Sequence, residues 1–136
     1  EETSVNVMID PTFRETVSYF PKRDTQKTVV YFIARAKNLG DENLGYDLKF
    51  DEEQRKQSAH MEIAMVRSAY RGNGLQKKLM EAAEEQLRSA GFRWLMGTAH
   101  PDNVYSVHNF EQLGYKLVTK ALKYGGLPRY IFCKKI

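Results

Sequence analysis

The sequence predicts one domain with a mixed α/β fold, and three observations support this prediction. A chain of 136 residues can bury about two thirds of its unfolded surface in a single core. Helical and strand patterns alternate through its middle, and two strand patterns pair near its end. The longest uninterrupted apolar run, Val29–Ala34, is too short to cross a membrane as a helix. We therefore expect one compact α/β domain without a membrane span.

The first 57 residues predict few regular elements. Residues 10–21 favour a short helix, because Asp and Pro open the stretch, apolar side chains recur at helical spacing and a second Pro ends it. Residues 28–36 are rich in β-branched and aromatic types, which predicts a buried strand. Residues 37–57 are polar and turn-rich. We expect this last stretch to be an insertion with little regular structure beyond one helical turn after Asp51.

The rest of the chain predicts six elements in a regular succession. The clearest is a helix over Leu75–Ala90, in which apolar residues recur every fourth position and Gly91 follows as a stop. The others follow from shorter patterns of the same kind. They are strands at His60–Val66 and Arg93–Ala99, a helix from Val104 to Gly114, and strands at Tyr115–Leu122 and Arg129–Lys134.

Charge and cysteine content limit the class of protein. The net charge is +4, with six basic residues and no acid in residues 115–136, and six acids against one lysine in residues 41–53. One segment could face phosphate and the other a cation, although both could equally be solvated surfaces. Cys133 is the only cysteine, which excludes an internal disulfide and a multi-thiolate zinc site and favours a reducing, cytoplasmic setting.

Two further features of the sequence set expectations about its ends and about metals. The chain begins with two glutamates, without an initiator Met or the pattern of a secretory signal, so we expect a processed or trimmed chain. The three histidines, His60, His100 and His108, have no metal-ligand spacing, and we expect no metal.

The most informative junction is the loop of residues 71–76, between a strand and the strongest helix. Glycines at a helix start let the backbone approach a ligand, and the unpaired amides with the positive end of the helix dipole favour a phosphate. The alternative is a plain strand-to-helix turn. A Rossmann fingerprint would need a small residue at Lys77, and a P-loop would need a lysine at Tyr46, so neither motif is present.

The segment Val66–Leu75, running into this helix, resembles the acyl-CoA binding motif of the GNAT superfamily of N-acyltransferases. That pattern is Arg or Gln, two residues, Gly, one residue, then Gly or Ala; Arg71 and Gly74 match it, whereas Gln76 departs from it. Residues 100–115 resemble the family's later strand and helix in order and spacing. The resemblance implies a central mixed, mostly antiparallel sheet with flanking helices, a shortened N-terminal part and a single acyltransferase domain over residues 1–136.

The resemblance also implies a reaction and its binding residues. The reaction is transfer of an acetyl group from acetyl-CoA to a primary amine, directly within a ternary complex and without a metal. The positions implied to bind acetyl-CoA are Met65, Val66, Arg71, Gly72, Asn73, Gly74, Leu75, Gln76, Asn103 and Ser106. Of these, Asn103 could equally be a helix cap.

Such a transfer needs a base, because an alkyl ammonium is only about 0.1% neutral at pH 7. Glu62 and His60 are two residues apart on a predicted strand and therefore share one face, and the family often draws its base from this strand. We expect Glu62 to be the base, with His60 second. The alternative is a solvent-facing glutamate and a structural histidine.

The leaving thiolate also takes up a proton. Phe110 stands where a tyrosine of the family commonly donates this proton, and a phenyl ring cannot donate one. Tyr105, Tyr115 or Tyr124 could replace it, or the thiolate could leave without a dedicated acid. Phe110 therefore favours a second hypothesis, a GNAT-like sensor or partner module that binds acyl-CoA without efficient transfer.

The partner expected for this protein is a small-molecule or peptide amine. We predict that the acidic segment of residues 41–53 helps to recruit a cationic acceptor, the alternative being that it only keeps a loop soluble. A nucleic-acid-binding domain would rest on the basic C-terminal segment alone, because no RNP-like, zinc-finger or helix-turn-helix signature is present. We expect no nucleic-acid or membrane partner, and the oligomeric state, a homodimer included, stays open.

Overall fold

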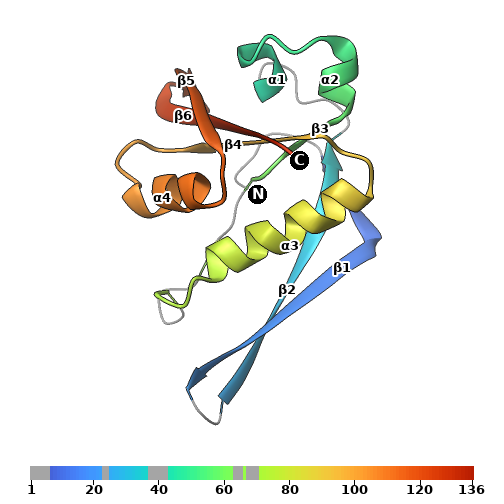
Figure 1. Cartoon of the computed structure of the whole chain (residues 1–136), viewed down its shortest axis with the longest axis vertical. Helices are drawn as coiled ribbons and strands as arrows, with labels where there is room; N and C mark the ends of the chain where they lie inside the picture. Colours follow the sequence, from blue (N-terminus) through green and yellow to red (C-terminus); the bar gives the residue numbers. More distant parts are fainter. Residues whose placement is uncertain (1–6, 23–24, 37–42, 63–65, 67–70) are drawn as a thin grey trace. The chain divides into compact units, whose positions relative to one another are not determined.

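The structure, a computed structural model, describes residues 7–22, 25–36, 43–62, 66 and 71–136, with side chains from residue 43 onward. The chain divides into two compact units, Glu1–Gly40 and Asp41–Ile136. Figure 1 traces the described elements of both units along the chain. Every candidate site residue described below belongs to the second unit.

The first unit contains an antiparallel hairpin of β1 (Val7–Lys22) and β2 (Thr25–Ala36). The strand expected at residues 28–36 is confirmed, whereas the helix expected over residues 10–21 is wrong. The register of the hairpin shifts between Ile9 and Arg14 and between Tyr19 and Lys22, and a proline lies in each gap. Proline cannot donate to a β-ladder and is tolerated at such irregularities, so the two prolines that suggested helix ends mark breaks in a strand.

The second unit contains a four-stranded sheet in the order β3-β4-β6-β5. Only β3 and β4 pair in parallel, which confirms the expected mixed, mostly antiparallel sheet. The two expected closing strands and the turn between them are confirmed. The observed ends of these strands differ from the expected ends by at most two residues. The bounds are β3 (Ser58–His60), β4 (Trp94–Ala99), β5 (Lys116–Lys123) and β6 (Leu127–Lys135).

The strand expected at His60–Val66 needs a correction, because β3 ends at His60. The backbone amide of Met61 still donates to the carbonyl of Met96, at 2.6 Å, and no later pairing with β4 occurs among the described residues. Glu62 and Val66 therefore lie outside the strand, and Met65 lies outside the described residues. The alternation of polar and apolar residues continues past His60, the last residue of β3.

Helices cover both faces of this sheet (Figure 1). Helices α1 (Leu44–Asp47) and α2 (Glu52–Lys56) lie on one side, and α3 (Leu75–Ser89) and α4 (Val104–Gln112) lie on the other. The helical turn expected after Asp51 is confirmed, with Asp51 and Gln54 forming a reciprocal capping box. No helix in the described ranges is both long and apolar enough to cross a bilayer.

The core lies on the two faces of β4 and β6. On one face Leu44 of α1 packs with Met96 and Ile131. On the other, the ring of Phe110 from α4 stacks on Phe132, with centroids 4.8 Å apart. This stacking depends on Gly97, because a Cβ there would lie 2.6 Å from the Cζ atom of Phe110.

We expect Gly97→Ala to lower the free energy of unfolding by about 1–3 kcal/mol, because the added methyl group overpacks the site. Chemical denaturation with an unchanged m-value would measure the loss. The double variant with Phe110→Leu tests the cause, since the shorter side chain removes the clashing ring atoms. If Gly97→Ala costs as much beside Leu as beside Phe110, the steric explanation is wrong.

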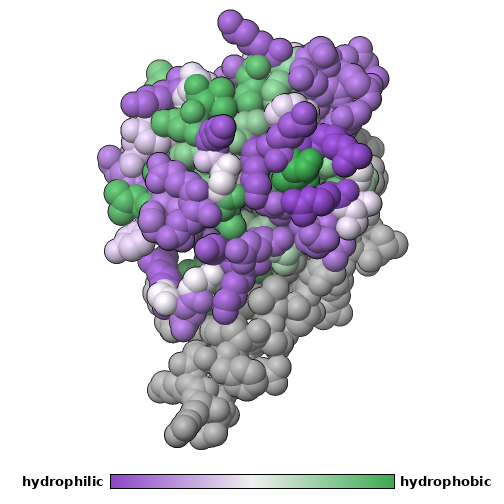
Figure 2. All heavy atoms as spheres, in the orientation of Figure 1, coloured by the Kyte–Doolittle hydropathy of each residue, from purple (hydrophilic) through white to green (hydrophobic). Residues whose placement is uncertain are grey.

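The edge strand β5 contributes little to the core. Its apolar side chains Leu117, Val118 and Leu122 are 44%, 49% and 71% exposed. Figure 2 shows hydrophobic side chains among the predominantly hydrophilic ones on the visible surface of the described part. β5 leads into the turn that joins it to β6.

Candidate active site

The candidate site lies at the edge of the sheet where the parallel strands β3 and β4 end. Glu62 follows β3, and residues 100–103 follow β4. Ala99 at the end of β4 pairs with Tyr130 near the start of β6, so the β5–β6 turn meets the same edge. Ligands of α/β sheets bind at the carboxyl ends of strands. Three segments therefore meet at this edge: the one after β3, the one after β4, and the β5–β6 turn.

The start of α3 has no side-chain cap and has open space beside it. Gly72 and Gly74 have φ of +82° and +65°, and no atom of the described residues, beyond the adjoining ones, lies within 4 Å of where a Cβ would stand on either. The side chains of Asn43, Asp51 and Asn103 cap α1, α2 and α4, but α3 has no side-chain cap. Among the described helices, α3 alone lacks a side-chain acceptor for its first amides.

The charge around this start favours an anion. The first turn of α3 contains no acidic residue. Lys77 and Lys78 lie in that turn, and Arg71 precedes it with its Nε donating to the carbonyl of Val66 at 3.2 Å. Positive side chains and the positive helix end act in the same direction. Residues 71–78 could therefore hold an anionic group such as a diphosphate.

Gln76, the residue that departs from the motif, joins α3 to α4. Its side-chain nitrogen donates to Ser106 Oγ at 3.1 Å, and its oxygen accepts from Asn109 Nδ2 at 2.8 Å. Asn109 was not among the predicted site residues; its position three after Ser106, on the same helix face, is the signal that could have found it. Asn103 accepts from the amide of Ser106 at 3.2 Å and so takes the capping role.

The two predicted candidates for the base are in contact. His60 Nδ1 lies 3.5 Å from Glu62 Oε1, and their side chains are 9% and 31% exposed. The Tyr124 hydroxyl donates to the same oxygen of Glu62 at 3.3 Å. His60, and in smaller measure Tyr124, lower the pKa of Glu62 despite its partial burial. Glu62 is therefore a carboxylate at neutral pH.

His60 is held in the interior with its polar atoms unused. Both ring nitrogens are buried and neither has a hydrogen-bond partner among the described residues. The 3.5 Å separation from Glu62 exceeds an ordinary hydrogen bond, and a small ring rotation would close it. His60 therefore lies beside the Glu62 carboxylate but is buried, whereas Glu62 is exposed enough for a substrate to reach it.

Two of the aromatic residues considered for the leaving group are in the core. Phe110 and Tyr115 are each 3% exposed, and their rings meet edge to face at 5.1 Å. Burial, with Glu84 nearby, raises the pKa of Tyr115 well above its ordinary value. Tyr105, at the start of α4, is 82% exposed. Tyr115 is therefore unsuited to donate a proton to a thiolate that meets solvent.

Cys133 is equally unsuited to carry an acetyl group. It lies on β6, is buried and is not in a disulfide. Burial raises the pKa of its thiol to about 11. At pH 7 roughly 0.01% of such a thiol is ionised, and the thiolate is the nucleophilic form.

The acidic segment is engaged with its own surroundings at its described positions. Asp47 pairs with Lys123 at 2.6 Å, and Glu52 pairs with Lys56 at 2.8 Å. Asp51 caps α2, and Glu53 accepts from Gln57 at 2.8 Å. These contacts give the acids structural roles, and the Glu52 side chain stays 76% exposed.

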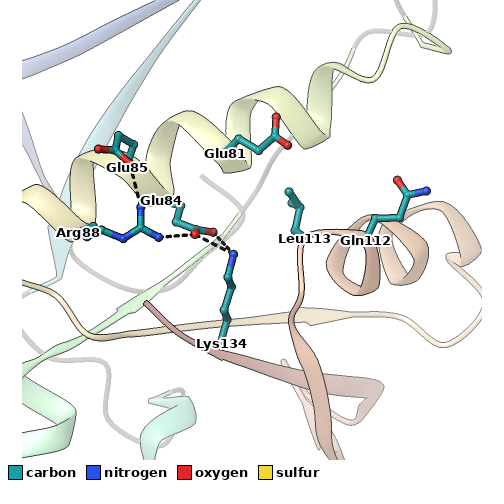
Figure 3. A pocket seen from close by; sticks show the side chains of 7 residues that line it. All are labelled: Glu81, Glu84, Glu85, Arg88, Gln112, Leu113 and Lys134. Atoms are coloured by element: carbon teal, nitrogen blue, oxygen red, sulfur yellow. Dashed lines mark hydrogen bonds and ion pairs between the residues drawn. The ribbon is translucent and has the colours of Figure 1, made fainter.

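A cavity of about 360 Å³ lies away from the predicted site residues, between α3, the end of α4 and β6. Figure 3 shows its central interaction, in which the buried carboxylate of Glu84 pairs with the ammonium of Lys134 at 2.6 Å and with the guanidinium of Arg88 at 2.8 Å. The charged side chains that line the cavity are largely paired with one another, and the pair of Glu84 with Lys134 joins α3 to β6. Its lining residues are Glu81, Glu84, Glu85, Arg88, Gln112, Leu113 and Lys134.

We expect Lys134→Met to destabilise the protein by about 2 kcal/mol, because the buried Glu84 would lose one of the two basic side chains that pair with it. Thermal unfolding at neutral pH would measure the effect. Lys116→Met, on the exposed strand β5, is the matched control and should change stability little. Equal effects of the two substitutions would show that the buried pair is unimportant.

Comparison with known proteins decides the family. A family model described as Acetyltransferase (GNAT) family matches residues 8–115. The chain belongs to the GNAT acetyltransferase family. None of the curated proteins matches the sequence of this GNAT chain.

Solved structures show the same fold. The GNAT-family acetyltransferase from Streptococcus pneumoniae is 25% identical, with a TM-score of 0.51, over 59% of this chain and 51% of that one. The putative acetyltransferase yncA from Salmonella typhimurium, solved with its cofactor acetyl-CoA, is 19% identical, with a TM-score of 0.53, over 60% and 49%. The chain thus spans about half the length of these two proteins.

One neighbour extends the match to most of this GNAT chain. A putative acetyltransferase from Agrobacterium tumefaciens is 16% identical, with a TM-score of 0.53, and the match covers 90% of this chain and 76% of that one. At this identity the likeness concerns the fold alone. The implied GNAT-like architecture is confirmed.

Proposed function

We propose that this protein is an N-acetyltransferase that transfers the acetyl group of acetyl-CoA directly to a primary amine. The observation that carries the proposal is the start of α3, which is uncapped, flanked by basic residues and open beside Gly72 and Gly74. We propose further that residues 1–136 act as one domain. The family match supports this, because it crosses the boundary between the two units at Gly40.

The start of α3 and the start of α4 would hold the cofactor. The amides of residues 72–76 would bind the diphosphate, with Arg71 and Asn73 at the rim of the loop. Asn103 and Ser106 would contact the pantetheine arm, using the polar atoms that the cap and Gln76 leave free. The assignment of Met65 and Val66 to the acyl end rests on the resemblance.

Glu62 would receive the proton of the acceptor. When bound, acetyl-CoA supplies a thioester whose carbon–sulfur bond breaks as the carbon–nitrogen bond to the amine forms. The acceptor attacks as the neutral amine, after its ammonium has released one proton to solvent. The nitrogen becomes strongly acidic as the new bond forms, so the Glu62 carboxylate can take the second proton directly or through water. The departing thiolate, with an ordinary pKa near 8.5, takes a proton from solvent. The ionised state of Glu62 suits this role and also attracts an ammonium group.

Direct transfer is favoured over a covalent intermediate on cysteine. The only cysteine of the chain is buried, and its thiol remains protonated at neutral pH. The acceptor would be a small-molecule or peptide amine, recruited in part by the exposed acids between residues 41 and 53. A reducing, cytoplasmic compartment would suit an enzyme with an unpaired cysteine.

Turnover with a panel of amines, read by release of free CoA thiol, tests this proposal. We expect thiol release that depends on a cationic amine and on the concentration of both substrates in a sequential pattern. A second candidate, an acyl-CoA sensor, is favoured by Phe110, whose ring is buried where the family commonly has tyrosine. Tight CoA binding without thiol release for any small or peptide amine would select the sensor.

A further inference from the structure

The turn between β5 and β6 contains a tyrosine in an unfavourable backbone conformation. Tyr124 has a φ of +53°, and Gly125 and Gly126 follow with φ of +79° and +102°. Glycine adopts such angles freely, whereas a tyrosine is strained there and persists only where its surroundings hold it. Because strained residues of this kind concentrate at functional sites, Tyr124 is a candidate functional residue.

The Tyr124 side chain is in contact with Glu62 and with Arg129. Its hydroxyl donates to Glu62 Oε1 at 3.3 Å, across 62 residues of sequence. The guanidinium of Arg129 lies over its ring, 5.3 Å from the centroid. A cation over a phenol holds the ring in place and makes its hydroxyl a better donor. The turn thus delivers a rigid hydrogen-bond donor to Glu62.

Glu62 needs such a donor because its own backbone lies beyond the ladder. It comes two residues after the end of β3, and its side chain is about a third exposed. The groups that face its carboxylate are His60 from β3 and Tyr124 from the β5–β6 turn, with Arg129 of β6 behind the tyrosine ring. Among the described side chains, Tyr124 is the one that approaches the carboxylate from another part of the sheet.

We propose that Tyr124 is a positioning residue, which holds the ionised carboxylate of Glu62 at the acceptor end of the site through its hydroxyl group. The β5–β6 turn thereby becomes part of the catalytic machinery, although it contains none of the family motif identified in the sequence. This inference rests on the proposed function, in which Glu62 receives the proton of the amine.

Tyr124→Phe tests the proposal, because it removes the hydroxyl and keeps the ring against Arg129. We expect the pKa of Glu62, followed by carbon-13 NMR of its carboxyl group, to rise, since the ionised form loses a donor. With a cationic acceptor, kcat should fall about three- to tenfold while the KM for acetyl-CoA stays unchanged. Tyr46→Phe, on the 59% exposed tyrosine of α1, is the matched control and should change neither quantity.

The two readouts separate the inference from the proposed function. An unchanged Glu62 pKa in Tyr124→Phe overturns the inference. A raised pKa with an unchanged kcat also overturns it, provided that Glu62→Gln is inactive. If Glu62→Gln is itself fully active, the base assignment of the proposed function fails, and with it the catalytic meaning of the tyrosine, even where the NMR shift shows that the contact exists.

Discussion

Glu62→Gln should lower turnover by about 10²- to 10³-fold while leaving the affinity for CoA unchanged, because it removes proton acceptance but keeps the shape of the side chain. Glu62 is partly exposed and is a carboxylate at neutral pH, both of which the role requires. Steady-state kinetics with acetyl-CoA and the best amine of the panel would measure the loss. Glu111→Gln, an exposed glutamate of α4, is the control and should retain full activity.

The pH dependence gives the same substitution a second readout. His60 and Tyr124 lower the pKa of Glu62, so its carboxylate is lost only as the pH falls below the ordinary glutamate range. The wild-type enzyme should show an acidic limb in that region, and Glu62→Gln should lack it. An active Glu62→Gln together with a crippled His60→Ala would transfer the base role to the histidine.

Gly74→Val should weaken CoA binding at least about tenfold, because a branched side chain would fill the space through which the diphosphate approaches the amides. That space is open in the structure, and the residue has φ of +65°. Calorimetric titration with CoA would measure the change, with a melting curve to show that the variant is folded.

The backbone strain of this substitution has its own control. Gly91, at the other end of α3, also has a positive φ, of +91°, and open space around it. Gly91→Val should therefore cost similar stability without affecting CoA affinity. If both variants lose affinity equally, or if Gly74→Val loses none, the loop does not bind the diphosphate.

The sequence predicted those features that depend on local signals. The glycines of residues 71–76, the fourth-residue apolar repeat of α3 and the turn before β6 are each contained within a few residues, and each was found in place. The helical turn expected after Asp51 is local in the same sense, and the structure shows that a capping box closes it. Local chemistry of this kind decides where helices start and turns form.

What could not be predicted depends on pairing between distant residues. Residues 10–21 form a strand because β2 pairs with them, and β3 ends where its ladder with β4 ends. Gln76 finds Ser106 thirty residues away, and Glu62 finds Tyr124 across the sheet. No periodicity within a single segment contains these contacts, so the partners of the candidate base required the structure.

The most direct test of the central claim is a crystal structure of the protein with CoA. It should place the diphosphate within hydrogen-bond distance of the backbone amides of residues 72–76, with the pantetheine arm along the start of α4 and the thiol at the edge of the sheet that holds Glu62. A diphosphate bound elsewhere, with the start of α3 left in solvent, would contradict the account.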